Sequence, residues 1–260
     1  MTAKATLKKI VASSLALAGL TAALPGLCPA QDSNQPQFLR VTTYKIKPDM
    51  VQEWESLIKN DVLPAYKKAG VSQVSAWDTA NFGNGNEYTT AIPIAKFGDL
   101  DGTSPLARAL APDALANLLS RARKCVIESH SVAVRSHPEL SIMHEMSEPP
   151  SIALVTTTHV APGHVADFRN FLKTEVVPAY TKAEVQQYWV YETVFGGDAN
   201  EWTSLLLYKK YADLDAGPLL VKAIGQEGYE KLLGKTAGIV ASTNRTLLHY
   251  RGDLSAQGGN

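Results

Sequence analysis

The sequence predicts an α+β fold built from two copies of one β-α-β-β-α-β unit, and two observations carry this prediction. First, identical residues recur at a constant separation of 114 positions (162 − 48 = 114) across the 260-residue chain. Second, strand-like and helix-like patterns follow in the same order in each half. Solenoid repeats have much shorter periods, so the pattern indicates a duplicated domain. The matched pairs include Val41/Val155, Thr42/Thr156, Thr43/Thr157, Pro48/Pro162, Pro64/Pro178, Tyr66/Tyr180, Asn86/Asn200, Glu87/Glu201 and Ser141/Ser255.

Each copy opens with a strand and an amphipathic helix. The run Arg40–Ile46 is rich in β-branched residues, as is typical of a strand, and the second copy restates it at 152–160. Pro48 suits the first turn of the following helix, where the missing N–H is not needed. Apolar residues then recur at helical spacing, at Met50, Trp54, Leu57, Ile58 and Val62 and again at Val165, Phe168, Phe171, Leu172 and Val176.

A proline and a second strand follow each helix. Pro64 and Pro178 stand near the helix ends, where a proline removes a hydrogen bond and is expected to bend the last turn. Residues 72–79 and 186–193 then predict the second strands.

A hairpin, a further helix and a last strand complete each copy. Glycine and asparagine at 83–86 and 196–198 supply the positive φ angles of a hairpin turn, and the third strands open at Glu87 and Glu201. The remaining predicted elements are short helical segments at 99–101 and 213–215, helices at 114–122 and 229–237, and strands at 127–134 and 240–248.

This order is the ferredoxin-like arrangement, in which helices cover one face of a sheet and leave the other face bare. Two copies in one chain can bring their bare faces together, so we expect a single-chain pseudo-dimeric α/β barrel. The predicted boundaries are a first repeat at 31–141, a linker at 142–150, a second repeat at 151–256 and a tail at 257–260. Pro149-Pro150 marks the end of the linker because the residue before a proline resists helix.

The first thirty residues have the pattern of an export signal. Lys4, Lys8 and Lys9 precede an apolar stretch at 10–20, and small residues at 28 and 30 suit cleavage before Gln31. The alternative is an uncleaved membrane anchor, but the apolar run is short for a membrane span. The sequence therefore predicts a signal peptide at 1–30 and a secreted or periplasmic protein.

Composition narrows the partners. Lys plus Arg equals Asp plus Glu at 25 each, so no long-range field favours nucleic acid or an anionic membrane. After cleavage Cys125 is the remaining cysteine, which leaves no partner for an intrachain disulfide. We expect Cys125 to be a buried, inert thiol at the end of an apolar helix.

The element order and the duplication resemble the dimeric α/β-barrel superfamily, and within it the chain is most similar to NIPSNAP-like proteins. The residues that carry the resemblance are Tyr44-Lys45-Ile46-Lys47-Pro48, Val62-Leu63-Pro64-Ala65-Tyr66 and Gly85-Asn86-Glu87, with their counterparts at 158–162, 176–180 and 200–202. These motifs place the fold and are not catalytic signatures. The resemblance implies a barrel of unassigned biochemical role, with relatives that include monooxygenases and haem-handling proteins.

Motifs of known chemistry are missing from the sequence. It contains no Walker loop, no His-Glu-x-x-His helix, no Cys-x-x-Cys pair and no Gly-x-Ser-x-Gly elbow, and it predicts no metal site. His137 and His144 flank the linker, where we expect them at the surface.

One candidate proton carrier stands out. His159 occupies the strand position that Lys45 occupies in the first copy. If Thr43, Lys45, Thr157 and His159 point into the barrel, they place hydrogen-bonding groups and an imidazole that titrates near neutral pH inside it. The alternative is that these side chains lie near strand ends with their polar tips in solvent.

Aromatic residues on the second strands supply the candidate ligand-binding surface. Trp77, Trp189 and Tyr191 are large rings with polar tips, which could line a pocket for a small apolar or aromatic ligand. Core packing is the commoner use of such rings in strands and is the alternative.

Two functions of different classes remain open. One is a cofactor-free NIPSNAP-like module that binds a small ligand or self-associates as a homo-oligomer. The other is a cofactor-independent monooxygenase-like or isomerase-like enzyme in which His159 orients or deprotonates a small aromatic substrate. Haem is a third option, with His130, His159 or His249 as the axial ligand.

Overall fold

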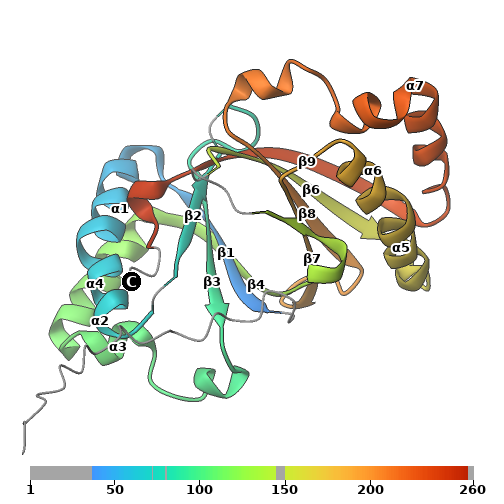
Figure 1. Ribbon diagram of the computed structural model, residues 1–260. Coiled ribbons are helices and arrows are strands. Elements are labelled where there is room, and N and C mark those ends of the chain that lie inside the picture. The colour runs from blue at the N-terminus through green and yellow to red at the C-terminus, as the bar shows by residue number, and fades with distance from the viewer. Residues whose placement is uncertain (1–36, 72, 80, 145–149, 257–260) are drawn as a thin grey trace, which may run out of the picture. The chain divides into compact units, whose positions relative to one another are not determined.

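In the computed structural model, eight antiparallel strands close into a barrel (Figure 1). The structure describes residues 37–71, 73–79, 81–144 and 150–256. The strands are β1 Phe38–Ile46, β2 Ser75–Asp78, β3 Glu87–Ile94, β4 Val126–Ser136, β5 Ile142–Met143, β6 Ile152–Val160, β7 Gln187–Phe195, β8 Glu201–Tyr208 and β9 Val240–Tyr250. The helices are α1 Val51–Leu57, α2 Leu63–Lys68, α3 Pro105–Ala109, α4 Pro112–Cys125, α5 Val165–Phe171, α6 Val177–Lys182 and α7 Leu219–Gly234.

The strands are neighbours in the order β4-β1-β3-β2-β9-β6-β8-β7, and pairing of β4 with β7 closes the ring. Two of these pairings join the first half (residues 37–144) to the second half (residues 150–256). At the β2–β9 seam Trp77 lies opposite Tyr250, and at the β4–β7 seam Ser136 lies opposite Tyr191. The predicted α+β class is therefore confirmed, with a closed antiparallel barrel at its centre.

Helices cover the outer face of the barrel in each half (Figure 1). In the first half, Trp54 of α1 packs against Tyr44 of β1, with ring centroids 4.9 Å apart. In the second half, Phe168 of α5 packs against Trp202 of β8, with centroids 5.6 Å apart. These contacts identify which alternate residues of each strand face the helices, because neighbouring residues of a strand point to opposite faces.

Each proline that was expected to bend a helix end instead follows a π-helical segment. The segments Ile58–Val62 and Leu172–Val176 lie between α1 and α2 and between α5 and α6. Pro64 and Pro178 come in the first turn after them, and the helix continues to Lys68 or Lys182. A proline cannot donate to the carbonyl four residues earlier, and the wider π turn accommodates that missing donor.

Two short arms exchange between the halves. Residues 137–143 (the first arm) follow β4, and residues 251–256 (the second arm) follow β9. Leu140 of the first arm is 2 % exposed within the second half's core, and Leu254 of the second arm is 1 % exposed within the first half's core. Each half therefore inserts a leucine into the hydrophobic core of the other.

Backbone hydrogen bonds repeat the exchange at both seams. The amide of His137 donates to Val190 in the first exchange, and the amide of Arg251 donates to Ala76 in the second. Each arm also carries a serine whose hydroxyl accepts from the neighbouring strand. The two arms make matching contacts at positions 114 residues apart.

Some predicted elements differ from the structure. β2 spans only Ser75–Asp78, which is shorter than the predicted strand at 72–79. The helix predicted at 229–237 is α7, which already begins at Leu219 and is interrupted at Gly225, where φ is 74°. The predicted signal peptide at 1–30, the tail at 257–260 and most of the linker lie outside the described residues. Within the described part of the chain, no helix has both the length and the apolar character needed to cross a membrane.

Candidate functional site

The inner face of the barrel carries the side chains that alternate with the helix-facing ones. On β8, Trp202 and Leu206 are buried beneath the helices, whereas Thr203 and Leu205 face inward and stay partly exposed. A filled barrel would bury inward residues in the middle of its strands. Neighbouring side chains therefore do not cover Thr203 and Leu205 completely.

Strand register assembles the inward residues of the second half into rows. One row runs through Asn244, Thr157, Thr203, Tyr191 and Ser136 on five neighbouring strands. It combines one amide, from Asn244, with the hydroxyls of two threonines and a serine and the phenol of Tyr191. Such a row offers hydrogen-bonding groups along the inner wall of the barrel, which suits a small ligand with a polar edge.

The equivalent row of the first half is filled differently. It runs through His130, Thr43, Thr89, Trp77 and Tyr250. Trp77 is 7 % exposed, and its ring centroid lies 5.0 Å from that of Tyr250 in an edge-on contact. Trp77 therefore packs in the interior of the first half, as the core-packing alternative expects.

The second half has smaller side chains at this place. Tyr191 stands where the first half has Trp77. Ser136, at the β4–β7 seam, stands where the β2–β9 seam has Tyr250. Burial raises the pKa of the Tyr191 phenol well above its usual range, although the side chain remains partly exposed. The phenol is thus neutral within the protein, and its partner across the seam is a serine where the other half has a second ring.

The next apolar row carries Trp189. Its cross-strand partner is Leu205, which pairs in turn with Val155, so three apolar side chains adjoin the polar row. The indole of Trp189 donates to Oε1 of Gln187 at 2.7 Å, which fixes the ring. Trp189 and Tyr191 are therefore brought together on one face of β7, as the sequence spacing suggested.

His159 and Lys45 lie on the inner side of their strands but near one end. His159 is 38 % exposed, with Nδ1 3.4 Å from Asp198 and Nε2 3.5 Å from Glu201. The hydrogen bond from the Asn200 amide is the larger cause, and the contact with His159 the next, of a lowered pKa at Asp198. Lys45 is exposed, and its cross-strand neighbours are Glu87 and Glu128. Both side chains have carboxylate neighbours, but only His159 belongs to the half with the smaller interior side chains.

The three histidines considered for haem do not converge. His130 and His159 lie on the inner faces of β4 and β6, whereas His249 lies on the outer face of β9, with Nδ1 3.4 Å from Asp78. Two of them are also engaged by carboxylates. The described residues contain no group of three or more His, Cys, Asp or Glu side chains arranged to hold a metal ion.

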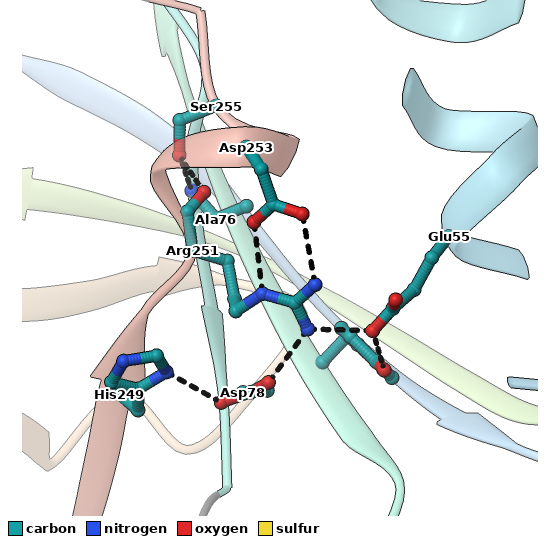
Figure 2. Close-up of polar contacts among 8 residues, drawn as sticks. Glu55, Ala76, Asp78, His249, Arg251, Asp253 and Ser255 are labelled. Atoms are coloured by element: carbon teal, nitrogen blue, oxygen red, sulfur yellow. Dashed lines mark hydrogen bonds and ion pairs between the residues drawn. The ribbon is translucent and has the colours of Figure 1, made fainter. Parts of the chain in front are cut away.

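A partly buried arginine holds the β2–β9 seam together (Figure 2). The guanidinium of Arg251 contacts Glu55 at 2.6 Å, Asp78 at 2.9 Å and Asp253 at 3.0 Å. Hydrogen bonds from Arg251 lower the pKa of both Glu55 and Asp253, and Tyr88 also donates to Glu55. One cation therefore ties a helix of the first half, strand β2 and the second arm to one another.

A buried histidine occupies the same place at the β4–β7 seam. His137 has a 4 % exposed side chain, with Nδ1 2.9 Å from Glu139 and Nε2 2.9 Å from Glu192. Its ring stacks on Trp202 at 4.8 Å. The expectation that His137 lies at the surface is wrong, because two carboxylates and an indole enclose it within the closing seam. His144 is exposed, as expected.

Sequence reasoning missed both seam clusters, although the 114-residue offset carries a signal for them. Asp78 corresponds to Glu192, and Asp253 corresponds to Glu139. The basic partners do not match in type, since Arg251 corresponds to His137. A search for identical residues at the 114-residue offset therefore misses these positions, where the acidic or basic character is retained but the residue type differs.

A separate surface pocket of about 390 Å³ lies between the π segment with α2 and the pair α3 and α4. Its basic side chains already have partners, because Lys68 donates to the Ala109 carbonyl and Arg121 pairs with Glu53 and Asp61. The pocket contains none of the candidate catalytic or ligand-binding side chains, and we do not place the functional site there.

Comparison with solved structures supports the fold. An anthrone oxidase-like protein matches with a TM-score of 0.57 and 9 % identity over 88 % of this chain and 96 % of its own. A provisionally assigned monooxygenase from Lactobacillus acidophilus NCFM matches with a TM-score of 0.55 and 14 % identity over 86 % of this chain and 97 % of its own. Such low identity shows a shared fold and no more.

NIPSNAP proteins are also among the structural neighbours, at partial coverage. One from Burkholderia xenovorans matches 37 % of this chain and 90 % of its own with a TM-score of 0.31 and 14 % identity. That likeness is too small to test the resemblance seen in the sequence. The sequence matches no protein-family model and no curated protein.

Proposed function

We propose that this protein binds a small, partly apolar molecule on the inner face of the second half of its barrel. The observation that carries the proposal is the partial exposure of inward side chains on β6, β7 and β8, among them Thr157, Tyr191, Thr203 and Leu205. Ser136 leaves room beside Tyr191 where the first half places a second ring. Partly apolar surfaces with a few polar groups are the usual lining of small-molecule sites.

The side chains define the kind of ligand. Val155, Leu205 and Trp189 supply an apolar wall, and the adjoining threonine hydroxyls and the Tyr191 phenol supply hydrogen bonds. A small aromatic molecule with a hydroxyl or carbonyl group matches both features. Its polar edge would lie along the threonines and its ring against the indole.

The architecture behind this proposal is a tandem duplication that reproduces a two-chain barrel in one chain. The recurrence of elements at one offset and the reciprocal leucine contacts of the two arms support this interpretation. The resemblance to NIPSNAP-like proteins, export after cleavage before Gln31 and self-association belong to the same proposal and rest on the sequence.

Probe binding to the folded protein tests the ligand site. We expect 8-anilinonaphthalene-1-sulfonate to bind the native barrel, and Leu205→Trp to weaken that binding about ten-fold by filling the inner face. The matched control is Leu233→Trp, which places the same ring at a position in α7 that is 46 % exposed. Unchanged binding by a folded Leu205→Trp protein would exclude the inner face as the site.

An enzyme is the second candidate, and the position of His159 favours it. The imidazole lies on the inner side of β6 between two carboxylates, one row from Thr157 and Thr203. Two structural neighbours are named as a monooxygenase and as anthrone oxidase-like. In this proposal His159 accepts a proton from a bound aromatic substrate, and Asp198 and Glu201 stabilise the imidazolium that forms.

Oxygen uptake with anthrone separates the two candidates. The enzyme proposal expects uptake by the wild type, its loss in His159→Gln and its retention in His164→Gln. His164 is a suitable control because it also pairs with a carboxylate, at 2.8 Å, but lies outside the barrel strands. Equal uptake by both variants would exclude His159 as the proton acceptor.

A further inference from the structure

The two seams that close the barrel are held by basic side chains of different chemistry. The second arm uses the guanidinium of Arg251, whereas the first arm uses the imidazole of His137 at the matching position. A guanidinium keeps its proton at every pH that proteins survive, but an imidazole exchanges its proton near neutrality. The β4–β7 seam therefore depends on the proton of a buried imidazole, whereas at the β2–β9 seam the imidazole of His249 is 42 % exposed and adds to a guanidinium that keeps its charge.

Both ring nitrogens of His137 lie within hydrogen-bond distance of a carboxylate. Nδ1 and Nε2 each lie 2.9 Å from a carboxylate oxygen, of Glu139 and Glu192 respectively. Burial opposes ionisation of Glu139, but the hydrogen bond from His137, a backbone hydrogen bond and the charges of His137 and Arg169 together outweigh it and lower the pKa of that carboxyl. Ionised carboxylates accept only, so both contacts are hydrogen bonds when the ring is an imidazolium.

Two arginines and a tryptophan complete the surroundings of His137. Arg135 on β4 contacts Glu192 at 2.5 Å, and Arg169 on α5 lies 3.5 Å from Glu139. Trp202 of β8 stacks on the ring and carries no charge. The two arginines keep Glu192 and Glu139 ionised when the imidazole loses its proton. The lone pair of the deprotonated ring nitrogen then faces a carboxylate anion inside the seam.

We propose that closure of the barrel at the β4–β7 seam is pH-sensitive. When pH rises and His137 loses a proton, the first arm loosens from β7, while Arg251 keeps the β2–β9 seam closed. Loss of the proton removes one of the two hydrogen bonds that join the ring to the carboxylates, so the seam weakens as pH rises. This inference does not depend on the identity or existence of a barrel ligand.

Hydrogen exchange of matched amides tests the proposal in one molecule. The reporters are the amides of His137 and Val190 at one seam and of Arg251 and Ala76 at the other. Between about pH 6 and about pH 9, we expect protection relative to the intrinsic rate to fall about ten-fold at the first pair and to change little at the second. Equal changes at both seams would overturn the proposal.

Two variants and one spectrum assign the pH dependence to the His137 ring. His137→Arg gives both seams the same cation and should make protection independent of pH, whereas the control His164→Gln, at an exposed position outside the barrel strands, should keep the wild-type behaviour. If His137→Arg does not fold, nitrogen NMR of the wild-type ring decides, since the proposal requires a proton on both ring nitrogens at about pH 6. A ring with one protonated nitrogen under those conditions would contradict it.

Discussion

Removing the leucine of one exchanged arm should destabilise the whole barrel. Leu254 is 1 % exposed and packs in the core formed by Trp54, Leu57 and Leu118. Leu254→Ala removes three carbons at about 0.8 kcal/mol each, or roughly 2.4 kcal/mol, and the cavity left behind raises the loss to about 3 to 4 kcal/mol. For a barrel of this size that loss lowers the Tm by roughly 6 to 16 °C.

Equilibrium unfolding in urea, followed by circular dichroism, measures this loss. Leu140→Ala should lose a similar amount because it makes the reciprocal contact and is 2 % exposed. The control Leu233→Ala, at a position 46 % exposed, should stay within about 0.5 kcal/mol of the wild type. A loss below about 1 kcal/mol for both arm variants would refute the idea that the arms join the halves.

Four more outcomes follow from the described contacts. Arg251→Met should cost about 2 kcal/mol by urea unfolding, because it removes the charged hydrogen bonds that Arg251 donates to three partly exposed carboxylates. Since Arg251 lowers the pKa of Glu55 below its usual 4.5, that share of stability is present above the usual value and lost as pH falls below it; urea midpoints in acid should show this in the wild type but not in Arg251→Met. Cys125 is 0 % exposed and burial raises its pKa, so Ellman's reagent should label it only as fast as the protein unfolds, and rapid labelling of the native state would contradict this. Gly196 has φ 87°, and a Cβ there would lie 2.4 Å from a β4 carbonyl oxygen, so Gly196→Ala should lower stability by about 2 kcal/mol, whereas Gly85→Ala, with open space at its Cβ, should not.

The elements that the sequence predicts well are those with strong local patterns. The openings of the third strands at Glu87 and Glu201 match the structure because turn-forming residues precede β-branched ones. The second strands are harder to delimit. β2 is much shorter than β7 because its length depends on pairing with β9, which local sequence does not encode.

The site is less predictable than the fold. The alternation of residues along β1 and β6 correctly groups Thr157 with His159, but it does not reveal that Ser136 borders the same row from β4. That neighbour comes from barrel closure, a contact between distant segments. The burial of His137 depends on the same closure, which explains why its position beside the linker was misleading.

Xenon pressurisation of crystals tests most directly whether the inner face of the second half can hold a ligand. The proposed function predicts electron density from xenon or ordered water beside Tyr191, between Thr157 and Leu205, because protein cavities of ligand size admit either one. Side chains of Trp189 and Tyr191 packed against β6 with no density between them would contradict it and would leave the barrel as a filled structural core.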